Sequence, residues 1–522
     1  MSSSESSPSL RWKLLRWLFF GVIGVFVLLA GIWGEENGRG QRAWLEYRQK
    51  LEAAGEKLDL PAFIPSAVPD EQNFAQTPFL APLMDYIVDA QFHVVQRNTN
   101  AARWAMDFAN DLPTSKASGD TREHSRVMDL GQLALEFQNA GNRESRPKKD
   151  RDSTTPAPTR PEAAKQILDS LQKYSAVVEE LRTAGQRPYS RFNIRYGDGP
   201  STLLPHLAII KRAALVFQIR AEAELELGQA DQALADIKMA IRVSNSITNE
   251  PFLICGLVRI ATLHIVLQPI WEGLATHRWS EAQLADLQQT LAQFDLLSEF
   301  VQVLRGERAG CNDMLNQLRG QKLHPDSLSV QQGMGLPMLP AGWVYQNQVL
   351  INRIYQEQFI SKVDTANRRL EASDLATAES LDKELTNGFA PHKILARMLV
   401  PAIAKTSIKY SFAEVSTTEA MLACALERFR LANGRYPEKL EELLPRYLAK
   451  VPHDVVGGGP LHYRLESDGQ FTLYSIGWNE KDDGGATGFL ESKSGTKTRD
   501  LNSGDWVWSS RVGEPVKRAA HP

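Results

Sequence analysis

The sequence predicts a mainly α-helical protein with one N-terminal transmembrane helix, an irregular helical domain with a tetratricopeptide-like hairpin, and a small C-terminal α+β module. Three observations predict this. The first is an uncharged apolar run over 17–34, and the second is helical spacing of apolar residues from Ala163 onward. The third is that a long helical pattern after about Lys405 gives way to short strand patterns and glycine-rich loops. We divide the chain into a cytoplasmic tail, a transmembrane helix, a stalk helix with a proline-rich segment, a helical domain and the α+β module. These segments are 1–16, 17–34, 35–82, 83–400 and 401–522.

The apolar run WLFFGVIGVFVLLAGIWG, from Trp17 to Gly34, is the predicted membrane anchor. It carries no charge, and at 1.5 Å per residue it extends roughly 27 Å, close to the hydrocarbon thickness of a bilayer. Basic residues precede the run at Arg11, Lys13 and Arg16. Tryptophans, which favour the membrane interface, lie near its two ends at Trp12, Trp17 and Trp33.

This pattern favours a signal anchor in the inner (cytoplasmic) membrane, with most of the chain on the periplasmic side. The alternative is a cleaved signal peptide, which has a shorter apolar run and a small-x-small cleavage site; LLAGIWGEE offers only a poor one. The charge asymmetry that sets orientation is reduced by arginines after the run, at Arg39, Arg42 and Arg48.

The next segments are a stalk helix over 42–58, with Trp44, Tyr47 and Leu51 on one face, and a proline-rich stretch over 60–82. Its prolines prevent a continuous helix, and we expect the stretch to lie along the surface of the domain. Residues 83–110 are expected to be helical. Two polar stretches, 113–125 and 141–162, are expected to be flexible loops.

Helices are then predicted over 163–184, 203–227, 230–246, 252–267, 281–294, 297–318 and, in pieces, 340–387. The run over 252–267 ends at Pro269 and contains Arg259 and His264, so a second membrane span would bury a charge in lipid. A helix buried in protein, with His264 as a core histidine, is the better interpretation. The step at Leu227 and Gly228 resembles a tetratricopeptide hairpin, but one hairpin does not establish a repeat array.

Composition and motifs narrow the function classes. A net charge of -3 without a strongly basic face argues against nucleic acid as a partner. The three cysteines form no C-x-x-C pair, and the ten histidines include no H-E-x-x-H. No catalytic residues are predicted. A cluster over 187–198, RPYSRFNIRYGD, could bind an anionic ligand through its arginines and tyrosines; a structured loop whose arginines pair with acidic neighbours is the alternative that we favour.

The C-terminal module begins with a long amphipathic helix that Gly434 terminates, and Pro437 opens a short helix. Two strands, LHYRLE (461–466) and QFTLYSI (470–476), are joined by SDG as a hairpin, and DWVW (505–508) is a last strand.

Four motifs of this module resemble the C-terminal domain of the major pseudopilins of type II secretion: NGRYP (433–437), VPHD (451–454), LYSIG (473–477) and the acidic loop that follows. The resemblance implies a structural calcium ion in that loop, with oxygen donors Asn479, Asp482, Asp483 and Asp505. The alternative is an ordinary exposed turn, where Asp and Gly also cluster. The chain lacks the processing site and the glutamate of a pseudopilin membrane helix, which argues against assembly into a pilus.

The arrangement as a whole, including VPDEQNFAQTPFL (68–80) and the sequence over 187–212, is similar to a set of single-anchor membrane proteins encoded by planctomycete and verrucomicrobial genomes. That resemblance implies membrane anchoring. We therefore expect a membrane-anchored envelope scaffold that binds a protein partner and has no evident catalytic activity. The alternatives are an accessory component of a type II secretion or pilus-like system, and an envelope hydrolase.

Overall fold

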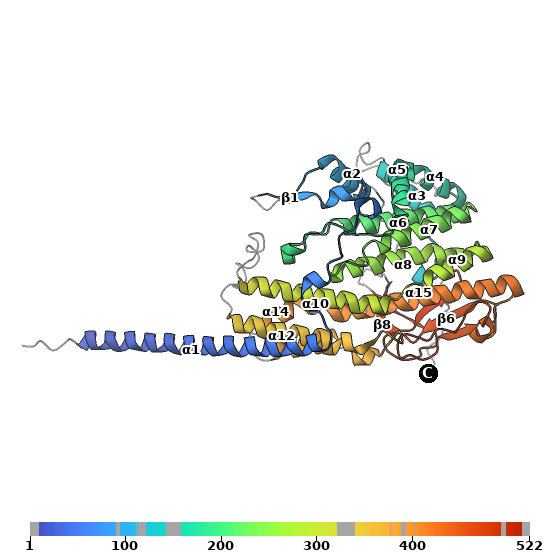
Figure 1. Ribbon diagram of the computed structural model, residues 1–522. Coiled ribbons are helices and arrows are strands. Elements are labelled where there is room, and N and C mark those ends of the chain that lie inside the picture. The colour runs from blue at the N-terminus through green and yellow to red at the C-terminus, as the bar shows by residue number, and fades with distance from the viewer. Residues whose placement is uncertain are drawn as a thin grey trace, which may run out of the picture. The chain divides into compact units, whose positions relative to one another are not determined.

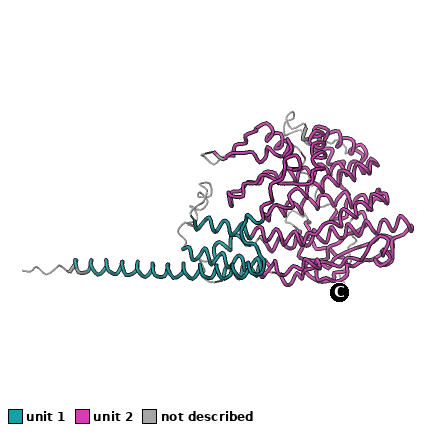
Figure 2. The backbone as a smooth tube through the Cα atoms, viewed as in Figure 1, with its two compact units in different colours: residues 1–62, 308–356, 378–401 teal, residues 63–307, 357–377, 402–522 magenta. Residues whose placement is uncertain are grey.

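The computed structural model describes residues 10–89, 94–110, 112, 122–141, 158–320, 340–375, 377–387, 393–400, 402–491 and 497–513. The chain is mainly helical with a few short strands, as predicted (Figure 1). Most of the two predicted flexible loops, 113–125 and 141–162, lies outside the described residues. Contacts divide the chain into two compact units (Figure 2), unit 1 with residues 1–62, 308–356 and 378–401, and unit 2 with residues 63–307, 357–377 and 402–522.

Unit 1 contains the long N-terminal helix α1, Leu10–Ala53. It is long and apolar enough to cross a membrane, and its most apolar window is not covered by protein. The predicted anchor and stalk are one continuous helix: no proline separates them, and Asn37-Gly38, a pair that often marks a turn, lies inside the helix. Trp44 and Leu51 share one face and pack with Leu58 and Tyr345, which confirms the predicted apolar face of the stalk.

The other helices of unit 1 are the end of α10 (Leu296–Gly320), α12 (Ala341–Gln358), α13 (Ala378–Thr386) and α14 (Ile394–Leu399). α1 and α12 approach closely at Gly40 and Gly342. A Cβ atom at Gly342 would lie 2.2 Å from the Glu36 carbonyl oxygen, so only glycine fits there. The Gly342 amide donates to Asn37 Oδ1 at 2.7 Å, which fixes α12 against α1.

Polar side chains pair between α10 and α12 at every fourth residue. The pairs are Arg308 with Gln356, Asn312 with Asn352, and Asn316 with Gln348. A spacing of four residues keeps each set on one helix face. Four of these side chains are buried, namely Arg308, Asn312, Gln348 and Asn352. We call this row the amide ladder; it fixes the register of the two helices.

Unit 2 is a stack of helices that rests on a small sheet. Its helices are α2 (Thr99–Asn110), α3 (Leu130–Gly141), α4 (Arg160–Leu171), α5 (Ser175–Gly185), α6 (His206–Glu226), α7 (Ala230–Asn245), α8 (Leu253–Ala275), α9 (Glu281–Leu291), the first part of α10, and α15 (Ala402–Asn433). α6 packs on α7 and α8, and α15 packs on α8 and α9 (Figure 1). The hairpin expected at Leu227 and Gly228 joins α6 to α7, and Gly228 has φ +74°.

The apolar helix α8 is mostly buried in protein, in line with the core-helix interpretation. It continues through Pro269 to Ala275, so the predicted end at Pro269 is wrong. Proline removes only one backbone hydrogen bond, and packing against α6 and α15 holds the helix together. Arg259 is neutralised inside the protein, since its guanidinium donates to Glu299 Oε1 at 2.8 Å and to Thr248 Oγ1 at 2.7 Å.

The stretch before α2 differs from the prediction of a helix from residue 83. A short 3₁₀ turn, Ala81–Met84, leads into a hairpin of β1 (Tyr86–Val88) and β2 (Val94–Gln96), whose β-branched residues favour strands. The proline-rich stretch has no continuous helix, as expected. It does not simply follow the surface, because Phe74, Phe79 and Leu80 are fully buried.

The C-terminal sheet has the order β5-β6-β9 and is antiparallel. β5 (His462–Leu465) pairs with β6 (Phe471–Ser475), and β9 (Trp506–Ser509) pairs with the other edge of β6, which confirms the predicted hairpin and last strand. A second hairpin, β7 (Thr487–Glu491) with β8 (Lys497–Gly504), was not predicted. A minor hairpin, β3 (Val363–Asp364) with β4 (Arg369–Leu370), lies elsewhere in unit 2.

Gly434 caps α15 as predicted, with φ +75° and its amide donating to the Arg430 carbonyl. The short helix expected at Pro437 begins later, at Leu440. The C-terminal module packs with the helices of unit 2, since residues 402–522 belong to the same compact unit as 63–307. One direct link is the hydrogen bond of 2.8 Å from Trp271 Nε1 on α8 to the Ser509 carbonyl on β9.

Candidate functional site

The acidic loop between β6 and β7 is the candidate site of the C-terminal module. The turn after β6 carries three of the predicted donors, and the fourth, Asp505, directly precedes β9. Because β9 pairs with β6, Asp505 returns to the loop, and its amide donates to the Ala486 carbonyl at 2.8 Å. The structure therefore brings together Asn479, Asp482, Asp483 and Asp505.

The Asp505 side chain accepts hydrogen bonds from two backbone amides of the loop. Its side chain is buried; Oδ1 accepts the Asp483 amide at 3.1 Å, and Oδ2 accepts the Gly485 amide at 2.6 Å. Burial raises the pKa of Asp505 to about 6, and the nearby carboxylates of Asp483 and Asp482 add to this rise. Negative charge is thus concentrated at the loop.

The other three predicted donors are also tied into hydrogen bonds. Asp482 Oδ1 accepts from the Tyr474 hydroxyl at 3.2 Å and from the Gly484 amide at 2.9 Å. Asn479 Nδ2 donates to Asp483 Oδ2 at 2.8 Å. The loop is therefore ordered by its own polar groups.

These hydrogen bonds bear on the expected calcium ion. Calcium takes six to eight oxygen ligands, whereas at least one oxygen of each acidic side chain here accepts a hydrogen bond from the protein. Within the described residues, no group of three or more His, Cys, Asp or Glu side chains is arranged to hold a metal ion. This arrangement does not form a calcium shell, and the Asn479 and Asp483 side chains would have to turn to make one. Calcium binding stays a prediction.

The VPHD motif has a structural use. Asp454 is buried, and its carboxylate accepts from Ser475 Oγ at 2.9 Å and from the Ile476 amide at 3.1 Å. These contacts fix the end of β6 where the acidic loop begins. The motif therefore positions the loop, which the sequence pattern alone did not indicate.

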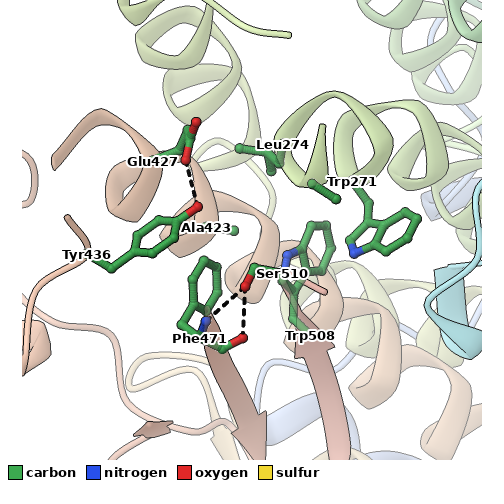
Figure 3. Close-up of a pocket in the computed structure, with 9 residues that line it drawn as sticks. Trp271, Leu274, Ala423, Glu427, Tyr436, Phe471, Trp508 and Ser510 are labelled. Atoms are coloured by element: carbon green, nitrogen blue, oxygen red, sulfur yellow. Dashed lines mark hydrogen bonds between the residues drawn. The ribbon is translucent and has the colours of Figure 1, made fainter. Parts of the chain in front are cut away.

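A small cavity lies between α8, α15 and the sheet (Figure 3). Four aromatic side chains line it: Trp271, Tyr436, Phe471 and Trp508. Its volume of about 10 Å³ holds one water molecule at most. Such a cavity has no room for a substrate.

Glu427 at the edge of this cavity is the centre of a hydrogen-bonded cluster. Its carboxylate accepts from Tyr436 Oη at 2.7 Å, from His277 Nδ1 at 2.8 Å and from the Arg430 guanidinium at 2.7 Å (Figure 3 shows the Tyr436 bond). Burial alone would raise the pKa of Glu427, but these three partners lower it to about 2. The carboxylate is satisfied by the protein and ties the end of α15 to the loop after α8.

The arginine cluster over 187–198 forms a structured loop, but its partners differ from those predicted. Arg187 donates to the carbonyls of Asn73 and Gln76 at 2.9 and 2.8 Å, and Arg191 donates to the Pro65 carbonyl at 2.9 Å. Arg195 donates to the Tyr86 carbonyl. These acceptors are backbone carbonyls, three in the proline-rich stretch and one on β1, and not acidic side chains.

A buried pair of glutamates, Glu222 on α6 and Glu272 on α8, escaped the sequence reasoning. Glu272 Oε1 accepts from the Met128 amide at 2.5 Å and from Gln268 Nε2 at 2.8 Å. Burial raises the pKa of both glutamates, and the charge of Glu272 raises that of Glu222 further. Each of the two buried carboxyl groups is therefore harder to ionise than a glutamate in water. The only sequence signal is a glutamate on the apolar face of each helix.

His264 and the three cysteines lie in the core of the protein. His264 is a core histidine as expected: its ring stacks on Phe412 at 5.0 Å, and burial lowers its pKa to about 3. The cysteines Cys255, Cys311 and Cys424 are free and buried.

Comparison with known proteins adds no relative: no protein-family model, curated protein or solved structure matches the chain.

Proposed function

We propose that this chain is a single-pass membrane protein that acts as a scaffold for a protein partner. α1 serves as the anchor, and most of the chain lies on the periplasmic side of the inner membrane. The observation that carries the proposal is the form of α1, whose apolar window is exposed while residues from Glu36 onward pack against α12. A helix that exposes large apolar side chains over a bilayer's length is stable in lipid and unfavourable in water.

Membrane extraction tests the anchor. The full chain and a variant without residues 1–35 are expressed in the same bacterium, and membranes are washed at high pH. The full chain is expected to stay in the pellet and to float with lipid, and the truncated chain to be released. Recovery of the full chain in the soluble fraction, or of a product cleaved after Gly34, would contradict the proposal.

Orientation is tested with single cysteines, because the native thiols are buried. A membrane-impermeant maleimide applied from the periplasmic side is expected to label Lys165→Cys, an exposed position on α4, and not Ser7→Cys before the anchor. The opposite pattern would reverse the orientation.

The partner is tested by affinity purification of the tagged full chain from solubilised membranes. A protein that co-purifies in independent preparations, and is absent with a tagged, unrelated single-span protein, supports the scaffold. Absence of any reproducible partner after cross-linking in intact cells counts against it.

A second candidate is an accessory component of a secretion or pilus-like machine. It is favoured by the combination of α15, the three-stranded sheet and the ordered acidic loop. For this candidate the co-purifying proteins are expected to be subunits of such a machine.

A further inference from the structure

Residues 65–80 of unit 2, a proline-rich segment that we call the strap, lie against the helices in the manner of a bound peptide. The strap contains one short 3₁₀ turn, Asp70–Gln72, and among the described residues it pairs with no strand of a sheet. Two of its aromatic side chains are nevertheless fully buried, since Phe74 is 0% and Phe79 is 1% exposed. The contacts of the strap therefore show what the surface beneath it recognises.

Arginines of the loop between α5 and α6 bind the main chain of the strap. Arg187 donates to the carbonyls of Asn73 and Gln76 at 2.9 and 2.8 Å, and Arg191 Nε donates to the Pro65 carbonyl at 2.9 Å. Every extended peptide offers carbonyl groups of this kind. These three contacts therefore do not depend on the side chains of the strap.

The same loop also pairs with the strap as one strand pairs with another. The Phe74 amide donates to the Tyr189 carbonyl at 2.8 Å, and the Tyr189 amide donates to the Gln72 carbonyl at 3.1 Å, which forms a parallel bridge. The Asn73 side chain accepts from the Arg191 amide and donates to the Arg191 carbonyl, both at 2.8 Å. Addition of a strand through main-chain hydrogen bonds is a common mode of peptide recognition.

Two aromatic anchors, five residues apart, fix the strap on different helices. The Phe74 ring lies beneath the Arg242 guanidinium of α7, 4.7 Å from it. The Phe79 ring packs edge-on against Trp104 and Phe108 of α2, with ring centroids 5.2 Å apart in both pairs. Buried aromatic anchors of this kind carry much of the binding energy at protein interfaces.

We propose that the strap occupies, within its own chain, a binding site for an extended segment of the partner protein. The segment that fits has two aromatic side chains five residues apart and a main chain free to bond with the loop between α5 and α6. The inference rests on the scaffold function proposed above and names the site where the partner binds.

Binding of the partner requires the strap to leave its site. Proteins open locally in cooperative units, and the strap is able to open as one such unit because it joins none of the described α-helices or sheets. A tethered segment competes at a high effective concentration. The site is therefore closed to weak ligands, and a partner segment must form more contacts than the strap does.

The first test uses the detergent-solubilised full chain and a fluorescent peptide with the sequence of residues 68–80, VPDEQNFAQTPFL. A chain with both Phe74→Ala and Phe79→Ala loses the anchors of its own strap. It is expected to bind the peptide at least about tenfold more tightly than the parent chain does, because its strap competes less well. The matched control peptide carries the same two alanines and is expected to bind weakly to both chains. Equal affinity of the two chains for the parent peptide, or of the altered chain for the two peptides, would overturn the proposal.

Hydrogen exchange of the parent chain provides a second test that does not depend on the folding of a variant. After correction for intrinsic rates, the protected amides of the strap are expected to exchange at least about tenfold faster than those of α6 and α7, because the strap opens while the helices stay folded. Equal exchange of the strap, α6 and α7 would mean that the strap opens only when the whole unit unfolds. That result would also overturn the proposal.

The outcomes separate this inference from the scaffold function, because neither measurement requires the partner or a membrane. Peptide binding by the altered chain, together with the absence of any co-purifying protein, would support the site and count against the scaffold. If the parent chain forms a dimer that the free peptide dissociates, the strap of a second copy occupies the site. That outcome would overturn the assignment of the site to a different protein.

Discussion

The amide ladder between α10 and α12 makes a prediction about unit 1. Asn312 Nδ2 donates to Asn352 Oδ1 at 3.2 Å, and Asn352 Nδ2 donates back to Asn312 Oδ1 at 2.7 Å. Both side chains are buried. We consider three variants: Asn312→Leu, Asn352→Leu, and the double substitution.

The expected magnitudes follow from which groups lose their partners. Asn352→Leu leaves Asn312 Oδ1 without its hydrogen-bond donor. Asn312→Leu leaves two acceptors without a donor: Asn352 Oδ1 and the Leu58 carbonyl, which accepts from Asn312 at 3.1 Å. Each single substitution should cost about 1–3 kcal/mol, the penalty for an unsatisfied buried polar group. The double substitution removes both facing amides, so its cost should fall short of the sum by about 1–2 kcal/mol.

Hydrogen exchange of α12 peptides in the detergent-solubilised full chain measures this locally. A loss of about 1.4 kcal/mol corresponds to a tenfold increase in the exchange rate when reclosing is fast. The single variants should each show such an increase in α12, with α6 and α7 unchanged as internal references. Strict additivity in the double variant, or single variants that exchange like the parent chain, would refute the facing amide pair.

Three further predictions concern other parts of the chain. Glu222→Gln should stabilise the fold more at pH 8 than at pH 5, as measured by thermal melting. Burial and the charge of Glu272 raise the pKa of Glu222 in the folded state above 4.5. The native state therefore holds a proton that the unfolded state releases, so the stability of the parent chain falls as the pH rises. Gly342→Leu should destabilise the docking of α1 by about 1–3 kcal/mol, measured as faster proteolytic release of α1, because its Cβ would meet the Glu36 carbonyl oxygen. Calcium should raise the melting temperature of the full chain relative to chelator, and Asp483→Asn should reduce that difference.

Controls and contrary outcomes are direct. Gly38→Ala adds a Cβ with nothing within 4 Å, so it should not speed proteolysis, and equal effects of both glycine substitutions would contradict the close approach. A stability gain from Glu222→Gln that does not change with pH would contradict the raised pKa of Glu222. A melting temperature indifferent to calcium would remove the metal prediction. The full chain is used because residues 402–522 pack within unit 2.

The sequence predicts the features that depend on local patterns. The uncharged run over 17–34, the cap at Gly434 and the hairpin around SDG each follow from side-chain period or turn chemistry within a few residues. The core placement of His264 follows from its apolar neighbours. These predictions require no knowledge of what lies opposite the segment.

The features that the sequence did not predict depend on distant partners. Pro269 stays inside α8 because α6 and α15 pack against the helix, and the arginines of the loop over 187–198 find carbonyls about a hundred residues earlier in the chain. The acidic loop is intermediate. Its members could be named from motifs, but Asp505 satisfies two loop amides, and that use of its oxygens is visible only in three dimensions.

The continuity of α1 also limits how the rest of unit 1 can turn relative to the apolar segment of the helix. A flexible linker would let it turn freely, but here the apolar segment and the contact with Gly342 belong to one α-helix. Each residue of an α-helix turns by about 100° and rises 1.5 Å. Inserting a single alanine after Gly34 would therefore rotate the rest of unit 1 by about 100° around the axis of α1. Inserting a whole helical turn would nearly restore its original orientation. The number of residues in α1 between the apolar run and Gly40 thus sets the orientation of the rest of unit 1 about the axis of α1.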